Sequence, residues 1–163
     1  MSFDTRLFGA RQTVRMMELA AARHLTDAAV LRDNGQWHGS VYLAGYSVEI
    51  YLKAAYFRYS GYSTAAEWSV IKATAETFAR TRCGISRLEF HNLDHWWTMI
   101  QARRAGAFST PWIPINTEHC VTWFNRFWRV EMRYLSLSPT LTEVNKTLEF
   151  AGQLQTDYPS LRS

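Results

Sequence analysis

Hydrophobic residues recur at helical spacing along most of the chain, and turn residues separate the segments in which they do so. Signals for β-strands are scarce. The pattern predicts five helices, over residues 5–32, 38–59, 64–80, 93–104 and 117–135. It also indicates a sixth, with Ser138-Pro139 as N-cap and first-turn proline and an end near residue 155. Residues 106–116, which contain Pro111 and Pro114, are expected to form a loop.

Short connections between helices of this length favour antiparallel neighbours. We therefore expect an all-α fold, an antiparallel up-and-down helical bundle of five to six helices. The length of 163 residues suggests a single domain spanning residues 1–163.

The second predicted helix carries charges inside an apolar and aromatic segment, VYLAGYSVEIYLKA at residues 41–54. At helical spacing it has an apolar stripe (Val41, Ala44, Val48, Leu52 and Ala55) and a second stripe of rings and charges (Tyr42, Tyr46, Glu49, Lys53 and Tyr56). Glu49 precedes Lys53 by one turn, the favoured order for an ion pair within a helix. Such a pair contributes only about 0.2–0.5 kcal/mol, so a partner helix, a second subunit or a ligand is needed to explain the charges.

Three arginines of the fifth predicted helix, Arg126, Arg129 and Arg133, share one face. Guanidinium groups at this spacing can follow the phosphates of a nucleic acid, or they can form an ordinary solvated basic face. Lys53 would add charge to this surface, and Tyr46, Tyr56 and Trp128 would offer rings for stacking. In the core we expect Glu49 to meet Arg133, with the Tyr134 hydroxyl bonded nearby, so that a polar cluster of Tyr46, Glu49, Lys53 and Tyr134 forms.

Candidate metal and cofactor motifs are weak. His91 and His95 are spaced one helical turn apart, but the sequence offers them no third ligand and lacks the glutamate of the zinc-protease helix motif. His91 is better explained as a residue that packs or caps at the start of the fourth helix. The chain has no glycine-rich phosphate loop, and we expect neither a metal nor a cofactor.

Charge and cysteine content narrow the setting. The net charge of +4 permits nucleic-acid or acidic partners without requiring them. Cys83 and Cys120 are far apart and are expected to be free thiols in a reducing cytosol. The start of the chain lacks the apolar core of a signal peptide, and the longest apolar stretch is interrupted by Glu49 and Lys53. We expect a cytoplasmic protein with no membrane partner.

Four pieces of the sequence resemble the HEPN domain family of bacterial and archaeal helical proteins. LAGYSVEIYLKA at residues 43–54 is similar to the family's second-helix signature, and Gly35-Gln36-Trp37 fits the turn before it. His91-Asn92-Leu93 is similar to its His-polar-Leu element, and Arg133-Tyr134 is similar to its Arg-Tyr element. The pieces follow the order that the family uses.

The resemblance implies a bundle of four to six helices that commonly forms a homodimer. It also implies a role in conflict systems, such as toxin–antitoxin, phage-defence or CRISPR systems. Many members are ribonucleases, whereas others are partners of nucleotidyltransferases or bind nucleotides without cleaving.

The ribonuclease members carry an arginine followed four to six residues later by a histidine, near the last core helix. In this chain no histidine follows Arg126, Arg129 or Arg133, and the one literal match, Arg32 to His38, lies across the first interhelical turn. We therefore expect a non-catalytic module that dimerises and binds RNA, DNA or a cognate protein partner.

Two alternatives stay open. One is a divergent ribonuclease in which His91 and Arg133 carry the catalysis. The other is a nucleotide-binding or purely structural dimerisation module, with the stripe of Tyr42, Tyr46, Glu49 and Lys53 as its interface.

Overall fold

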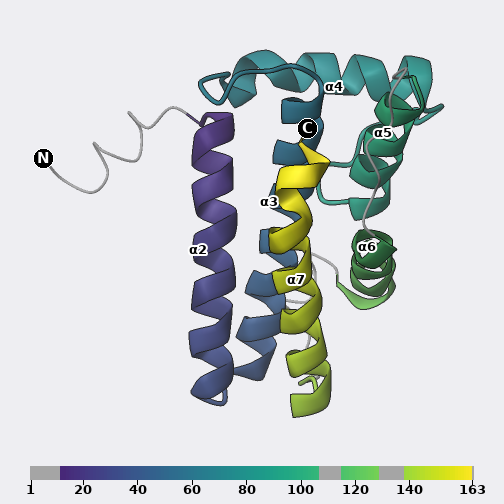
Figure 1. The fold of residues 1–163 in the computed structure, drawn as a ribbon. Coiled ribbons are helices and arrows are strands. Elements are labelled where there is room, and N and C mark those ends of the chain that lie inside the picture. Colours follow the sequence, from purple (N-terminus) through teal and green to yellow (C-terminus); the bar gives the residue numbers. More distant parts are fainter. Residues whose placement is uncertain (1–11, 107–114, 129–137, 163) are drawn as a thin grey trace, which may run out of the picture.

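The computed structural model describes residues 12–106, 115–128 and 138–162 (Figure 1). These ranges hold six helices, which are α2 (Val14–Asp33), α3 (Trp37–Tyr59), α4 (Trp68–Arg82), α5 (Leu93–Ala105), α6 (Ile115–Phe127) and α7 (Leu141–Leu161). They contain no β-strand, so the expected all-α helical bundle is confirmed. Within the same ranges, each helix is too short or too polar to cross a membrane.

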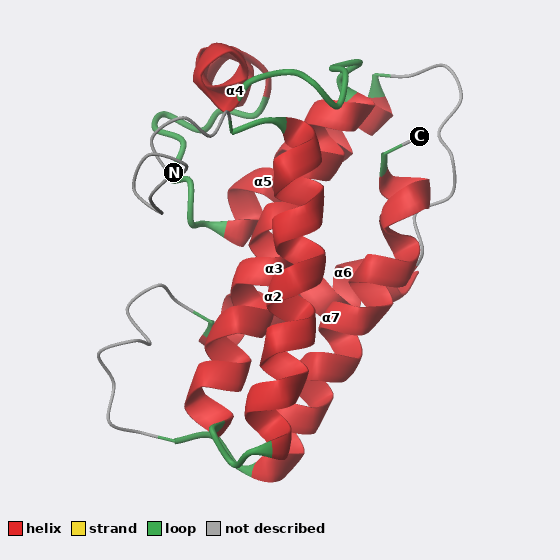
Figure 2. Ribbon diagram, turned by 90° about the vertical axis from the view of Figure 1, so that its left-hand side faces the viewer, coloured by secondary structure: helices red, strands yellow, loops and turns green. Residues whose placement is uncertain are grey.

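Helices α2 and α3 lie side by side and run in opposite directions (Figures 1 and 2). Two buried serines of α3 join them, because Ser40 Oγ donates to the Ala28 carbonyl (2.7 Å) and Ser47 Oγ donates to the Ala21 carbonyl (2.8 Å). The small alanine side chains at the contact let the two backbones approach closely enough for these bonds.

Helix α7 lies against both long helices and points in the same direction as α3 (Figure 1). Its C-terminal end reaches the first half of α2, where the Tyr158 hydroxyl donates to Glu18 Oε1 (2.7 Å), and the Tyr158 ring packs 5.0 Å from that of Tyr51. Helix α2 is thus antiparallel to both α3 and α7. The rule for short connections does not apply to α3 and α7, because they are not consecutive in the chain.

Helix α3 forms the centre of the bundle. The apolar stripe expected from its sequence (Val41, Ala44, Val48, Leu52 and Ala55) is fully buried, as predicted. The opposite stripe is largely covered too, because α5 and α6 lie on that side of the molecule and α4 crosses the end of the three long helices (Figures 1 and 2). The charged pair Glu49 and Lys53 is therefore enclosed within a single chain.

Helices α2 and α4 begin later than predicted. Helix α2 starts at Val14 with Thr13 as N-cap, so the expected start at residue 5 is wrong at Gln12 and Thr13, and residues 5–11 lie outside the described ranges. Helix α4 starts at Trp68 because the preceding segment runs beside the start of α2. There Val14 N donates to the Ala66 carbonyl (3.0 Å), which satisfies an amide that the helix itself leaves unpaired.

The ends of α6 and α7 also differ from the prediction. Helix α6 begins at Ile115, inside the expected loop, and ends at Phe127, so the expected helix is wrong at Trp128, and residues 129–135 lie outside the described ranges. Ser138-Pro139 is not the start of α7. Thr140 is the N-cap and forms a capping box with Glu143, and the helix continues past residue 155 because Tyr158 and Leu161 are buried.

Candidate functional site

A buried ion pair lies at the centre of the polar stripe of α3. Glu49 and Lys53 face the same side one turn apart, and the Lys53 ammonium donates to Glu49 Oε1. The ammonium also lies 5.8 Å from the ring centroid of Trp68 and 5.7 Å from that of Trp96. Rings at this distance attract a cation, so α4 and α5 both contribute to holding Lys53 in the interior.

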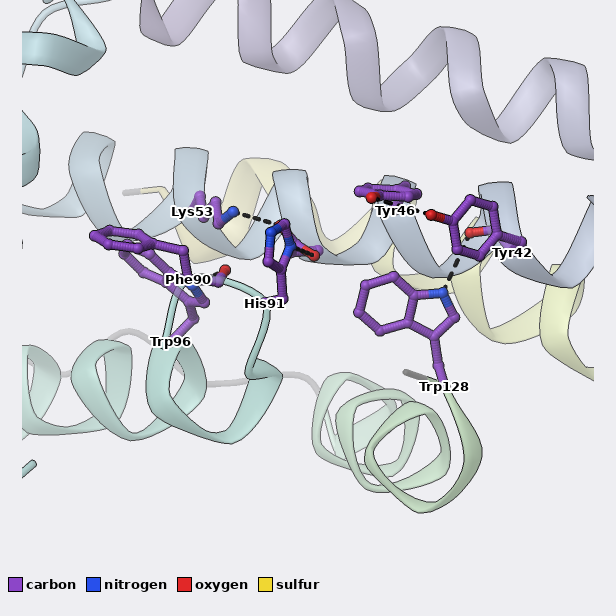
Figure 3. A network of polar contacts seen from close by, with 8 residues as sticks. Tyr42, Tyr46, Lys53, Phe90, His91, Trp96 and Trp128 are labelled. Atoms are coloured by element: carbon purple, nitrogen blue, oxygen red, sulfur yellow. Dashed lines mark hydrogen bonds and ion pairs between the residues drawn. The ribbon is translucent and has the colours of Figure 1, made fainter. Parts of the chain in front are cut away.

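His91 supplies the second partner of the buried carboxylate. Its Nδ1 lies 3.1 Å from Glu49 Oε2, and 53% of its side chain is exposed, so it connects the ion pair to the surface. Figure 3 shows His91 extending from the segment before α5 toward α3, between Lys53 and Tyr46. An ionised carboxylate can only accept a hydrogen bond, so this contact favours the His91 tautomer with a proton on Nδ1, which leaves Nε2 for a ligand or solvent.

Hydrogen bonds at the start of α5 fix the position of His91. Asn92 is the N-cap, and its side chain accepts from the amides of Asp94 (3.0 Å) and His95 (3.3 Å). On the other side of His91, Trp96 Nε1 donates to the Phe90 carbonyl (3.0 Å). His91 thus packs beside the helix start, as the sequence indicated, whereas the capping is done by Asn92.

Aromatic residues lie on the side of His91 that faces Tyr46. The Tyr46 ring lies 6.3 Å from the His91 ring in an edge-on arrangement, and the Tyr42 hydroxyl donates to that of Tyr46 (3.2 Å). At the end of α6, Trp128 packs 5.6 Å from Tyr46 and donates from Nε1 to the Tyr42 carbonyl (3.2 Å; Figure 3). This contact brings α6 against the polar stripe of α3.

His91 lines an open hollow of about 950 Å³. Helix α4 contributes three charged residues that share one face, Lys72, Glu76 and Arg80, and the segment before α5 contributes Arg87. Glu89 and Asp94 add negative charge, and Asn125 of α6 donates to Asp94 at the far side. The hollow therefore presents three cations and a half-exposed imidazole among three carboxylates.

The structure corrects several of the expected binding residues. Lys53 is buried and paired with Glu49, so it does not add charge to a nucleic-acid surface. Tyr56 and Trp128 are also buried, which removes them as stacking surfaces, whereas Tyr46 is half-buried. Arg126 is exposed on α6, as a surface contact requires.

The remaining predicted residues, Arg129, Arg133 and Tyr134, lie outside the described ranges, and so does the expected contact between Glu49 and Arg133. Within the described part of the chain, the partners of Glu49 are Lys53 and His91. These contacts explain the burial of the two charges without a second subunit.

His91 and His95 make separate contacts. His91 precedes α5 and contacts Glu49, whereas His95 Nδ1 accepts from the amide of Glu89 (3.2 Å). No group of three or more potential metal-binding side chains occurs among the residues that the structure describes.

Sequence reasoning missed the cations of the hollow. The signal that points to Lys72 and Arg80 is their two-turn spacing on one helix face, whereas Arg87 lies in an irregular segment that no periodicity covers.

Comparison with protein-family models, with curated proteins and with solved structures finds no match to this chain.

Proposed function

We propose that this chain is a HEPN-like module of bacterial conflict systems that associates with itself and binds single-stranded nucleic acid in the hollow around His91. The resemblance described above supplies the class of function. The observation that supports the binding surface is the half-exposed imidazole, which contacts a buried ion pair through Nδ1 and lies in a hollow lined by three cations and three carboxylates.

The charges of the hollow suit a phosphate backbone. Lys72, Arg80 and Arg87 come from two separate segments, so they can contact successive phosphates rather than a single one. His91 can donate or accept through Nε2, and the half-buried Phe90 beside Lys72 offers a ring to a base. The three carboxylates weaken the attraction, so we expect modest affinity that depends strongly on salt.

A second candidate, a divergent ribonuclease, is favoured by the bond between His91 and Glu49. A carboxylate that holds Nδ1–H leaves Nε2 free to take a proton from a ribose hydroxyl or to give one to a leaving oxygen. Cleavage also needs a group that stabilises the charged phosphorane, and Arg80 or Arg87 of the same hollow has the required charge.

The test is fluorescence anisotropy with labelled single-stranded RNA and DNA at low and high salt. Binding is expected at low salt and should weaken steeply as salt rises. The double variant Lys72→Glu/Arg80→Glu should weaken binding by roughly tenfold or more, because it reverses the charge of two of the three cations of the hollow. His119→Ala, an exposed histidine of α6 outside the hollow, is the matched control and should bind as the wild type does.

The RNA recovered from the same samples separates the two candidates. Intact RNA at high protein concentration supports the binding module. Cleavage that disappears in His91→Ala and persists in His119→Ala supports the ribonuclease. If neither RNA nor DNA binds at low salt, both candidates are wrong, and a cognate protein partner becomes the leading alternative.

A further inference from the structure

Helix α2 carries an apolar seam on its outer face. Three of the large hydrophobic side chains that are exposed in the described ranges belong to this helix, namely Met16 (49%), Leu19 (48%) and Val30 (55%). Isolated exposed hydrophobic residues are common on proteins. Here, however, they share a spacing, because residues 16, 19, 23, 26 and 30 alternate in steps of three and four, as in the contact seam of paired helices.

The flanks of this seam are small. Ala20, Ala22 and Ala29 border it and are only partly covered by the chain's own residues. Small side chains at the flanks let a second helix approach closely. Figure 1 shows α2 at the edge of the bundle, where none of the other helices in the described ranges lies against its outer side.

The centre of the seam is polar and determines which partner fits. Arg23 and Asp27 are 83% and 51% exposed and lie 3.8 Å apart in a loose ion pair. A parallel copy of α2 would place Arg23 against Arg23, which is repulsive. An antiparallel copy with Leu19 facing Val30 instead places Arg23 beside Thr26 and Asp27 of the second copy, and symmetry repeats this contact.

We propose that the outer face of α2, formed by Met16, Leu19, Arg23, Thr26, Asp27 and Val30, pairs with the same face of a second copy in antiparallel orientation. In the antiparallel register Arg23 of each copy lies beside Asp27 of the other, so the face is complementary to itself, and this property favours a second copy over an unrelated partner. The proposal deepens the self-association part of the proposed function and does not depend on nucleic-acid binding, because the seam and the hollow share no residue.

Sedimentation velocity over a range of concentrations tests the pairing by charge exchange. Arg23→Asp alone and Asp27→Arg alone should each weaken association by roughly tenfold, because each replaces two attractions with two repulsions. The double variant Arg23→Asp/Asp27→Arg should restore association, since the exchanged charges attract again. Both side chains are exposed, so the variants are expected to fold, which circular dichroism checks.

Apolar variants and a crosslink complete the test. Leu19→Lys should abolish association, whereas Val70→Lys on α4, a control at a more exposed valine, should leave it unchanged. In a Cys83→Ser background, the pair Leu19→Cys/Val30→Cys should form an intermolecular disulfide under mild oxidation. A wild type that stays monomeric at the highest concentration, or a double charge exchange that does not restore association, overturns the proposal. Nucleic-acid binding is measured separately on the same monomeric variants, so failure of one proposal is distinguishable from failure of the other.

Discussion

Glu49 and Lys53 are two charged residues in a helix that is buried on nearly every side. They are tolerated because each has more than one partner: the carboxylate accepts from Lys53 and His91, and the ammonium also faces the rings of Trp68 and Trp96. Removing one member of a buried pair takes the main partner from the other charge, which costs more than the pair contributes.

This asymmetry predicts the outcome of a double-mutant cycle. Lys53→Met should lower the free energy of unfolding by about 3–5 kcal/mol, because Glu49 stays buried without its main partner. The double variant Lys53→Met/Glu49→Gln should lose clearly less than the sum of the two single changes, because no charge is then left unpaired. Urea unfolding at neutral pH gives the free energy of unfolding of the wild type, the two single variants and the double variant. Additive losses would show that the two residues do not act as a pair.

Gly45 makes room for Trp128 on the surface of α3. A Cβ at this position would lie 1.9 Å from Cδ1 of the Trp128 ring, far inside contact distance. Gly45→Ala should therefore displace the indole and lower the free energy of unfolding by about 1–3 kcal/mol, although alanine is the better helix former. Thermal or urea unfolding, together with tryptophan fluorescence, detects the loss.

Gly152 of α7 is the matched control for this change. Nothing lies within 4 Å of a Cβ built there, so Gly152→Ala should raise the free energy of unfolding by about 0.5–1 kcal/mol. The interpretation of Gly45 fails if both substitutions stabilise the protein to a similar extent.

Part of the site could be predicted from single residues. The spacing of Glu49 and Lys53 predicted an ion pair within the helix, and the structure contains it. The contact between Glu49 and His91 joins residues 42 positions apart, and no local pattern encodes such a distance. Lys53 was expected at a binding surface because sequence gives the charge of a residue but not its burial.

At the scale of elements, the interiors of the helices could be predicted and several of their ends could not. Apolar periodicity determines which segments are helical, and α5 was predicted to within one residue. The start of α4 depends instead on a contact between residues 64–67 and α2, which is a tertiary interaction. The start of α7 was readable, since threonine and glutamate at positions 140 and 143 form the sequence pattern of a capping box.

At the scale of the whole molecule, the bundle divides into a structural part and a part that carries the site. Helices α2, α3 and α7 form the long core, tied by buried polar contacts such as that of Tyr158 with Glu18. Helices α4, α5 and α6 surround the polar stripe of α3 and form the hollow. The proposed self-association uses the outer face of α2, which leaves the hollow open to a ligand in each copy.

His24 is expected to make the free energy of unfolding of the folded chain depend on pH. Burial lowers its pKa from 6.5; Asp27 opposes this shift, and Arg23 adds a still smaller lowering effect. Within the described residues its Nδ1 is buried without a hydrogen-bond partner, so the fold favours the neutral ring. The unfolded chain then binds more protons than the folded one just below pH 6.5, and stability should fall as the pH drops through this range.

The experiment compares urea unfolding of the wild type and His24→Gln between about pH 7.5 and pH 5.5. The free energy of unfolding changes with pH only where the folded and unfolded chains bind different numbers of protons. The wild type should lose stability toward the acidic end, and His24→Gln should lose less, because glutamine does not titrate. His119→Gln, at an exposed position, is the control and should behave as the wild type does. Equal slopes for the wild type and His24→Gln would mean that His24 is equally easy to protonate in the folded and unfolded chain. The burial of its ring against Tyr46 would then have no electrostatic consequence.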